Sequence, residues 1–166
     1  MNAEARRQAV LEILRQSSQP ISASALANRF SVSRQIIVGD IALLRASGEN
    51  ISATPRGYVI LPEISGLIRQ IPCRHNAAGM ETELNAMVDQ GCTVIDVIVE
   101  HPTYGQLTGP LQLSNRYEVA QFIARNPQPL SALTDGIHLH TLSCPSEESF
   151  RRVQDSLRAM GILLEG

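Results

Sequence analysis

The sequence predicts an α+β protein of two domains, and three observations support this prediction. The 166 residues are enough for one ordinary domain or two small ones. The first third carries apolar residues at helical spacing, whereas the remainder alternates strand-like runs with helical ones. A short segment with Pro62 and Gly66 separates the two patterns, so we place the domains at residues 1–62 and 67–166.

The first domain is expected to contain three helices followed by a β-hairpin. Its helices show apolar residues three and four positions apart, and serines that can cap helices precede the second and third. Gly48 ends the third helix, and Thr54-Pro55-Arg56 forms a turn between two short strands. The expected elements cover, in order, residues 4–17, 22–27, 33–46, 51–53 and 57–60.

The second domain is expected to alternate strands and helices. Strands are predicted at residues 67–75, 92–100, 106–112 and 136–143, with a further short one at 162–164. Helices are predicted at residues 79–90, 115–125 and 146–160. This order is that of a ferredoxin-like α/β layer sandwich with an additional C-terminal helix.

The composition limits the class of protein. With 43% apolar and 18% charged residues, the chain is not of a disordered type. No apolar run is long enough to cross a bilayer, and the first residues lack the apolar stretch of a secretory signal. Three widely spaced cysteines argue against a disulfide framework. We therefore expect a soluble, cytoplasmic protein without a membrane partner.

The net charge of −2 hides an asymmetry between the two parts of the chain. The net charge is +3 over residues 1–70 and −5 over residues 71–166, and all 14 basic residues are Arg. The planar fork of Arg suits phosphate and guanine. This distribution indicates a polyanion-binding N-terminal domain joined to a domain with another role.

Residues 21–45 resemble the winged helix-turn-helix of bacterial transcription regulators. The resemblance implies that a recognition helix enters the major groove of operator DNA and that the hairpin contacts the minor groove or backbone. The expected DNA contacts are Ser31, Ser33, Arg34, Gln35 and Arg56. Alternatively, the helices simply pack and the arginines are solvated, or the module binds protein.

Gly39 departs from the polar residue expected on this recognition helix. Glycine has no side chain for a base, and within a helix it costs roughly 1 kcal/mol relative to alanine. The sequence therefore does not predict which bases of the operator this helix contacts.

All four histidines lie in the second domain, and two of them form a His-x-His pair on a predicted strand. Because side chains alternate along a strand, His138 and His140 share one face. We expect Ile137 and Leu139 to face the core beneath the helices, which leaves the histidines on a polar face. The alternative is a pair of exposed or hydrogen-bonded histidines without a ligand.

Two further residues suggest a metal site. His75 ends the first predicted strand, a neighbour of the His138/His140 strand in the ferredoxin-like order, and Glu83 lies on the following helix. Three imidazoles and one carboxylate suit one divalent transition metal ion, such as nickel, zinc, iron or manganese. An octahedral ion would keep two open positions. Thiolate ligation by Cys73 or Cys144 is an alternative, although a buried free cysteine usually acts as a small apolar residue.

The pattern of these residues resembles the three-histidine (3H) domain of niacin-responsive repressors of the NiaR type. His75, Glu83, the run Val99-Glu-His-Pro-Thr-Tyr-Gly105 and the run Gly136-Ile-His-Leu-His140 carry the resemblance. It implies His75, Glu83, His138 and His140 as metal ligands. It also implies nicotinic acid as co-repressor of genes for niacin uptake or NAD synthesis.

The leading prediction is a homodimeric repressor that is not an enzyme. His101 and Tyr104 are the candidate contacts for nicotinic acid, although a His-Pro sequence also ends a strand in a turn. One alternative is a metal-dependent hydrolase or isomerase, for which Asp96 and Glu100 are the best of the few candidate general bases. Another is a regulator that senses the metal itself.

Overall fold

The computed structural model describes residues 1–61 and 66–166. The chain divides into two compact units. The division falls within residues 62–65, so the predicted boundary segment lies largely outside the described residues. None of the described helices is long and apolar enough to span a membrane.

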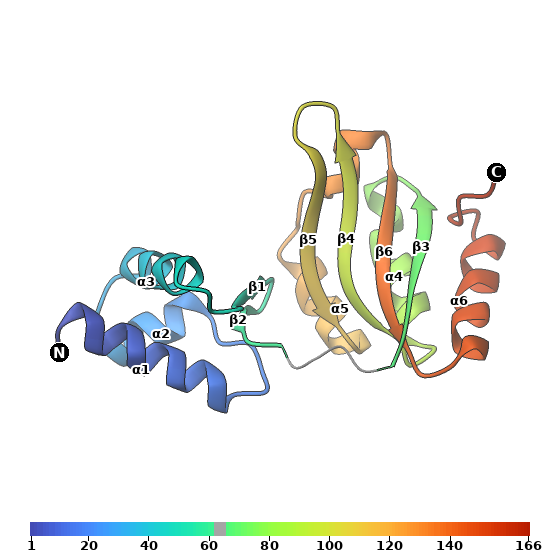
Figure 1. Cartoon of the computed structure of the whole chain (residues 1–166). Helices are drawn as coiled ribbons and strands as arrows, with labels where there is room; N and C mark the ends of the chain where they lie inside the picture. Colours follow the sequence, from blue (N-terminus) through green and yellow to red (C-terminus); the bar gives the residue numbers. More distant parts are fainter. Residues whose placement is uncertain (62–65) are drawn as a thin grey trace. The chain divides into compact units, whose positions relative to one another are not determined.

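The N-terminal unit consists of three helices and a hairpin, as predicted (Figure 1). Its elements are α1 (Ala3–Gln16), α2 (Ala23–Phe30), α3 (Arg34–Ala46), β1 (Ser52–Thr54) and β2 (Gly57–Val59). Helix α2 is longer than predicted and ends where Ser31 adopts a left-handed conformation, with φ 52°.

Side-chain caps fix where these helices begin. Asn2, Ser22 and Ser33 each accept a hydrogen bond from a backbone N–H in the first turn. The inward faces of the helices then form one core of apolar side chains. Its most deeply buried large members are Val10, Leu14, Leu26, Ile37 and Ile41. A backbone bridge between Ile21 and Tyr58 joins the hairpin to the segment before α2.

The C-terminal unit is a four-stranded antiparallel sheet with helices. Its strands are β3 (Leu67–Arg74), β4 (Thr93–His101), β5 (Gly105–Leu113) and β6 (Ile137–Cys144). The helices are α4 (Met80–Val88), α5 (Arg116–Ala124) and α6 (Glu147–Ala159), with short 3-10 turns η1 (Ala77–Gly79) and η2 (Leu130–Thr134). The strand predicted at residues 162–164 is reduced to a single bridge between Cys73 and Leu163.

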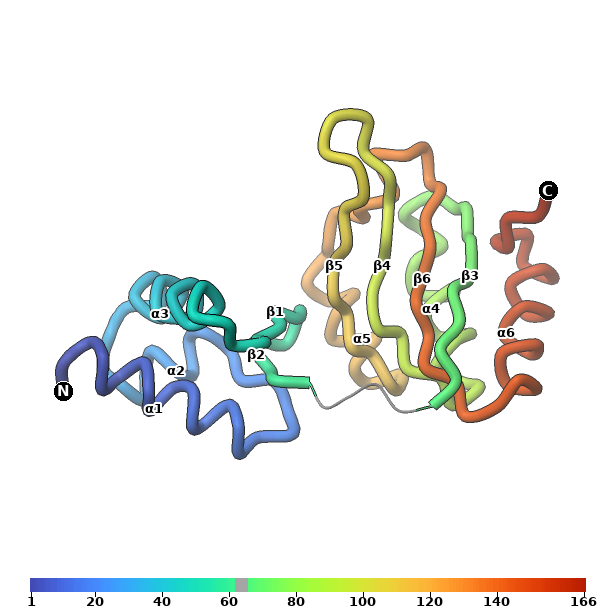
Figure 2. The backbone as a smooth tube through the Cα atoms, viewed as in Figure 1, coloured from blue at the N-terminus to red at the C-terminus, as the bar shows by residue number. Residues whose placement is uncertain are grey.

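The α+β class is confirmed, but the strand order differs in detail from a ferredoxin-like sheet. In that arrangement the first strand would lie between the third and the fourth. Here the order is β3-β6-β4-β5, so the last strand pairs on both sides, with β3 and β4. Figure 2 shows that the C-terminal unit begins with β3 at one edge of the sheet and continues through β4 and β5. The chain then returns as β6, which lies between β3 and β4. The predicted pairing of the His75 strand with the His138/His140 strand is nevertheless present.

The face of β6 that carries the histidines is the opposite of the predicted one. His138, His140, Leu142 and Cys144 are buried, whereas Ile137 is exposed. The core against this face includes Leu84 and Met87 of α4, Val119 of α5, and Val153 and Leu157 of α6. The histidines therefore point under the helices, where only a bonded polar group is tolerated.

Candidate functional site

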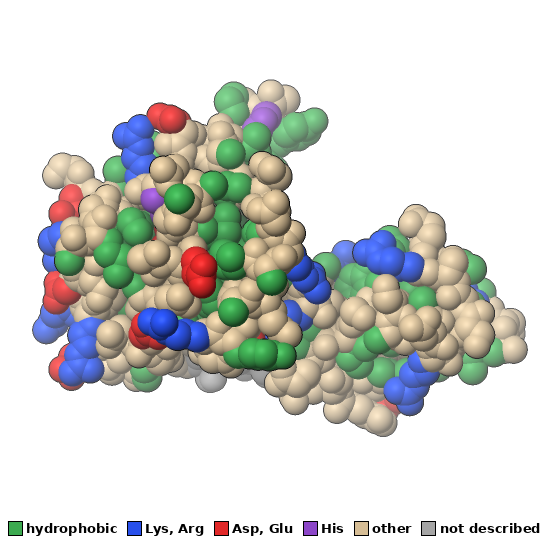
Figure 3. Space-filling view, turned by 180° about the vertical axis from the view of Figure 1, so that it is seen from behind, with side chains coloured by type: hydrophobic (Ala, Val, Ile, Leu, Met, Phe, Trp, Pro, Cys, Tyr) green, Lys and Arg blue, Asp and Glu red, His purple; other side chains and the backbone are tan. Residues whose placement is uncertain are grey.

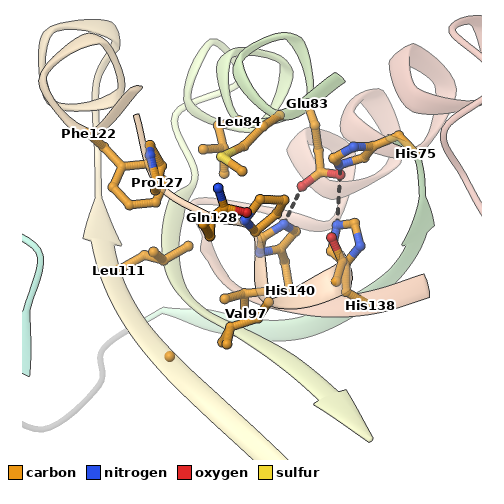
Figure 4. A pocket seen from close by; sticks show the side chains of 15 residues that line it. His75, Glu83, Leu84, Val97, Leu111, Phe122, Pro127, Gln128, His138 and His140 are labelled. Atoms are coloured by element: carbon orange, nitrogen blue, oxygen red, sulfur yellow. Dashed lines mark hydrogen bonds and ion pairs between the residues drawn. The ribbon is translucent and has the colours of Figure 1, made fainter. Parts of the chain in front are cut away.

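Four predicted ligand residues meet beneath α4, as Figure 4 shows. His75 follows β3, Glu83 lies in the first turn of α4, and His138 and His140 stand two positions apart on β6. The pairing of β3 with β6 brings His75 beside His138, and their ring centroids are 4.8 Å apart. The His138 and His140 rings are 4.9 Å apart.

The three imidazoles direct the same nitrogen at one carboxylate. Nε2 of His138 lies 2.8 Å from Oε2 of Glu83, Nε2 of His75 contacts that same oxygen, and Nε2 of His140 contacts Oε1. The side chains of all four residues are at most 7% exposed. Nε2 of His75 has no well-directed hydrogen bond among the described residues, despite its ion-pair contact.

The opposite nitrogens of the three rings all face backbone carbonyls. Nδ1 of His75 lies against the carbonyl of Asn76, Nδ1 of His138 lies 2.8 Å from that of Gly136, and Nδ1 of His140 lies 2.8 Å from that of Asp96. Since a carbonyl only accepts, each Nδ1 must carry a hydrogen. In the neutral rings, each Nε2 then presents a lone pair toward the negative carboxylate.

This arrangement requires a positive centre among the four groups. Protons are one solution: burial opposes charge on His75 and His140, but Glu83 outweighs it and raises the pKa of both. Burial likewise opposes ionisation of Glu83, but the imidazoles hold its pKa well below the usual range. A divalent cation is the other solution. Metal-binding histidines typically donate their second ring N–H to a carbonyl, as all three do here.

Cys73 lies close enough to Glu83 and His138 to form an alternative ligand set with them. Burial, with the nearby charge of Glu83, raises the pKa of the Cys73 thiol far above its ordinary value. The thiolate is the form that binds metal. The donor set of His75, Glu83, His138 and His140 therefore fits a cation better.

Two glycines to which the sequence assigned no role leave room for His75. A Cβ on Gly79 would come within 2.9 Å of the His75 ring, and a Cβ on Gly136 within 2.5 Å of the His75 carbonyl oxygen. Gly136 also has a φ of +86°, a conformation that favours glycine. Its place at the head of the Gly-Ile-His-Leu-His run was the available signal.

A cavity of about 210 Å³ adjoins the four residues. Its walls are largely apolar and come from α4, the sheet, α5 and the segment before β6 (Figure 4). The apolar lining includes Met80, Leu84, Val97, Leu111, Phe122 and Leu130. Gln128 contributes a polar side chain at its exposed side. A wider cleft shares His75 and Gln128 with this cavity, so His75 borders both spaces, whereas Glu83, His138 and His140 line only the first.

The structure does not bring His101 and Tyr104 to this cavity. They lie at the turn between β4 and β5, with ring centroids 5.1 Å apart, and Tyr104 is 75% exposed. Nδ1 of His101 accepts hydrogen bonds from the backbone N–H groups of Thr103 and Tyr104, at 3.0 and 3.2 Å. The turn interpretation of His-Pro thus accounts for His101, and the cavity residues replace this pair as the candidate ligand contacts.

Four of the five predicted DNA contacts are exposed on the N-terminal unit, and Arg56 is half-buried. Ser31, Ser33, Arg34 and Gln35 are exposed at the connection from α2 to α3. Oγ of Ser33 accepts the N–H of Ile36 at 3.2 Å, so this serine also caps α3.

Arg56 lies in the turn of the hairpin and donates a hydrogen bond to Oε1 of Gln19 at 3.3 Å. Figure 3 shows predominantly basic charged side chains on the N-terminal unit and both signs of charge on the C-terminal unit.

Comparison with known families agrees with this division. Residues 6–59 match a helix-turn-helix (HTH) domain family, and residues 68–166 match the 3H domain family. The chain is therefore a helix-turn-helix protein with a 3H domain.

Two curated relatives match almost the whole chain. A protein of Thermotoga maritima described as a probable transcription repressor NiaR is 42% identical over 164 residues, which cover 96% of this chain and 94% of that protein. The transcription repressor NadR of Bacillus subtilis is 42% identical over 168 residues, covering 96% and 93%. The chain belongs to the family of these proteins. Their descriptions support a regulator and not an enzyme, which removes the hydrolase or isomerase alternative.

Proposed function

We propose that this protein is a metal-dependent, nicotinic acid-responsive transcription repressor that controls genes for niacin uptake or NAD synthesis. The observation that carries the proposal is the convergence of three Nε2 atoms on Glu83, with every Nδ1 held by a carbonyl. The descriptions of the two relatives support the repressor part.

In this proposal, His75, Glu83, His138 and His140 hold one divalent transition metal ion, nickel or zinc. Imidazole nitrogens and a carboxylate suit both ions. A bound ion would offer its remaining coordination positions to a pyridine nitrogen or a carboxylate, the two donor groups of nicotinic acid. The residues around the site fix the directions of the imidazoles and keep the ligand set out of water.

The cavity beside the four residues suits the rest of that molecule. A single six-membered ring is flat and apolar on both faces, and the walls include Leu84, Leu111 and Phe122. A volume of about 210 Å³ accommodates one such ring but not a large ligand. We propose Leu111, Phe122 and Gln128, rather than His101 and Tyr104, as effector contacts.

The N-terminal unit would bind operator DNA through α3 as part of a homodimer in the cytoplasm. Paired recognition helices read half-sites about 34–36 Å apart or multiples of that distance. Nicotinic acid can strengthen DNA binding only if it binds the DNA-binding conformation of the protein more tightly than the other conformation. Such a coupling free energy is typically about 1–3 kcal/mol.

Isothermal titration tests the effector assignment. Metal-loaded and chelator-stripped protein are each titrated with nicotinic acid and with nicotinamide. The expected result is binding of nicotinic acid to the metal-loaded form only. Equal binding to the stripped form would contradict the role of the metal, and no binding to either form would contradict the effector. A separate measurement of operator binding tests the metal-sensor alternative. If the stripped protein regains full operator binding with metal alone, without nicotinic acid, the metal itself is the effector.

A further inference from the structure

The outward face of α3 offers few hydrogen-bonding groups. Residues three, four and seven positions apart share a helix face, and Ile36, Gly39 and Leu43 follow this spacing. Ile36 is 42% exposed and Leu43 is 56% exposed. The structure describes every residue of α3. The other exposed residues on this face of the helix are Gln35, Ala42 and Ala46. Gln35 at the first turn is thus the one polar side chain on it.

Charge on α3 favours an anionic partner. Asp40 is its one acidic residue, is 3% exposed and faces inward. The guanidinium of Arg6 donates to both carboxylate oxygens of Asp40, at 2.6 and 3.2 Å. The exposed charges of the helix are therefore basic and lie at its two ends, on Arg34 and Arg45. Five and six positions from Gly39 are well over a quarter turn around the helix, so both arginines lie on one flank of the apolar strip, and Nε of Arg45 also donates to the carbonyl of Ile51 at 2.8 Å. An apolar strip flanked by basic charge matches a groove lined by phosphates better than it matches an ordinary protein surface.

Gly39 lies at the centre of this strip, between Ile36 and Leu43. Apart from the adjoining backbone of α3 itself, no described heavy atom lies within 4 Å of the position that a Cβ would occupy there, so packing does not explain the glycine. A glycine inside a helix is also less stable than alanine. A close approach of the helix backbone to a binding partner accounts for it.

We propose that Ile36 and Leu43 contact thymine methyl groups in the major groove, and that Gly39 lets the α3 backbone approach the base edges. The inference rests on the proposed DNA-binding function and specifies how the sequence is read. The thymine C5-methyl is the apolar group that the major groove presents. Direct readout by the centre of α3 is thus apolar, while Arg34 and Gln35 supply the hydrogen bonds at its N-terminal end.

The test removes methyl groups from the DNA and leaves everything else unchanged. Full-length, metal-loaded protein selects binding sites from a random duplex library, with and without nicotinic acid. Each thymine of the selected site is then replaced singly by deoxyuridine. At one or two thymines per half-site, we expect the affinity to fall about fourfold for each lost methyl contact.

Protein variants identify the side chains that make these contacts. In Ile36→Ala and Leu43→Ala, the deoxyuridine replacement at the contacted position should cost little further affinity, as in a double-mutant cycle. Leu133→Ala is the matched control, because Leu133 is 52% exposed but lies in the C-terminal unit. This variant should keep the full deoxyuridine effect. Since Ile36 and Leu43 are exposed, the melting temperatures of both alanine variants should match that of the wild-type protein.

The outcomes separate this inference from the function on which it rests. Failure to enrich any sequence, with or without nicotinic acid, would contradict the proposed sequence-specific repressor. An enriched site whose thymines all tolerate deoxyuridine would overturn methyl readout and leave the repressor intact. A deoxyuridine effect that persists unchanged in both alanine variants would also overturn the inference.

Discussion

Replacing Gly39 by alanine should change stability and DNA binding in opposite directions. The residue lies inside the 13-residue helix α3, and the added methyl group meets no described atom within 4 Å apart from the adjoining backbone of the helix. The only effect on folding is then the intrinsic preference for alanine, about 0.5–1 kcal/mol. For a unit of this size, that corresponds to an increase in Tm of roughly 2–8 °C.

The same methyl group would stand between Ile36 and Leu43 at the proposed DNA surface. Overpacking a tight contact costs about 1–3 kcal/mol, so affinity for the selected duplex should fall at least fivefold. Circular dichroism melting and fluorescence anisotropy measure the two effects. Gly48→Ala is the contrasting control: its Cβ also meets open space, but a φ of +102° makes alanine unfavourable, so Tm should fall. A Gly39→Ala variant with unchanged DNA affinity would refute the close-approach argument.

Three further predictions concern the proposed metal site. His138→Ala should lose most bound metal by elemental analysis, while His101→Ala should retain it; equal retention would contradict the ligand set. Gly79→Ala should displace the ring of His75 and lower metal affinity roughly 10–100-fold, because neighbours that orient ligands act at that magnitude; unchanged affinity would show that the ring adapts. Acidification should release the metal, because protons compete for imidazole nitrogens, and a metal-sensitive dye measures the loss; metal retention independent of pH would exclude histidine ligation.

The helical unit was predictable because its signals are local. Serines that precede apolar periodicity set the starts of α2 and α3, and Ser22 and Ser33 do cap them. The end of α2 was less predictable. The helix ends because Ser31 adopts a left-handed conformation, which glycine or asparagine usually occupies. Strand order was harder still, since it depends on where β6 inserts, and no local pattern in β6 specifies its two partners.

The cluster of His75, Glu83, His138 and His140 was predictable because the strand period and the neighbouring strand bring the three histidines together. The side of the sheet on which the histidines lie was not predictable. Alternation places His138 and His140 on one face, but it does not say which face the helices cover. Hydrophobicity pointed to Ile137 and Leu139 as the core residues, and the opposite is observed because Leu142 and Cys144 continue the histidine face into the core.

The orientation of His140 shows why the inner geometry of the site could not be read from the sequence. The pairing of β4 with β6 shifts register between Val94 and Asp96. There the carbonyl of Asp96 faces Nδ1 of His140, while Oδ1 of Asp96 accepts the backbone N–H of Thr141 at 3.1 Å. The Asp96 carboxylate, a candidate general base in the sequence, therefore bonds to the sheet backbone, and the Asp96 carbonyl orients the imidazole of His140. Because all three Nδ1 partners are carbonyls, this support depends on chain path and not on residue type, so it leaves no motif.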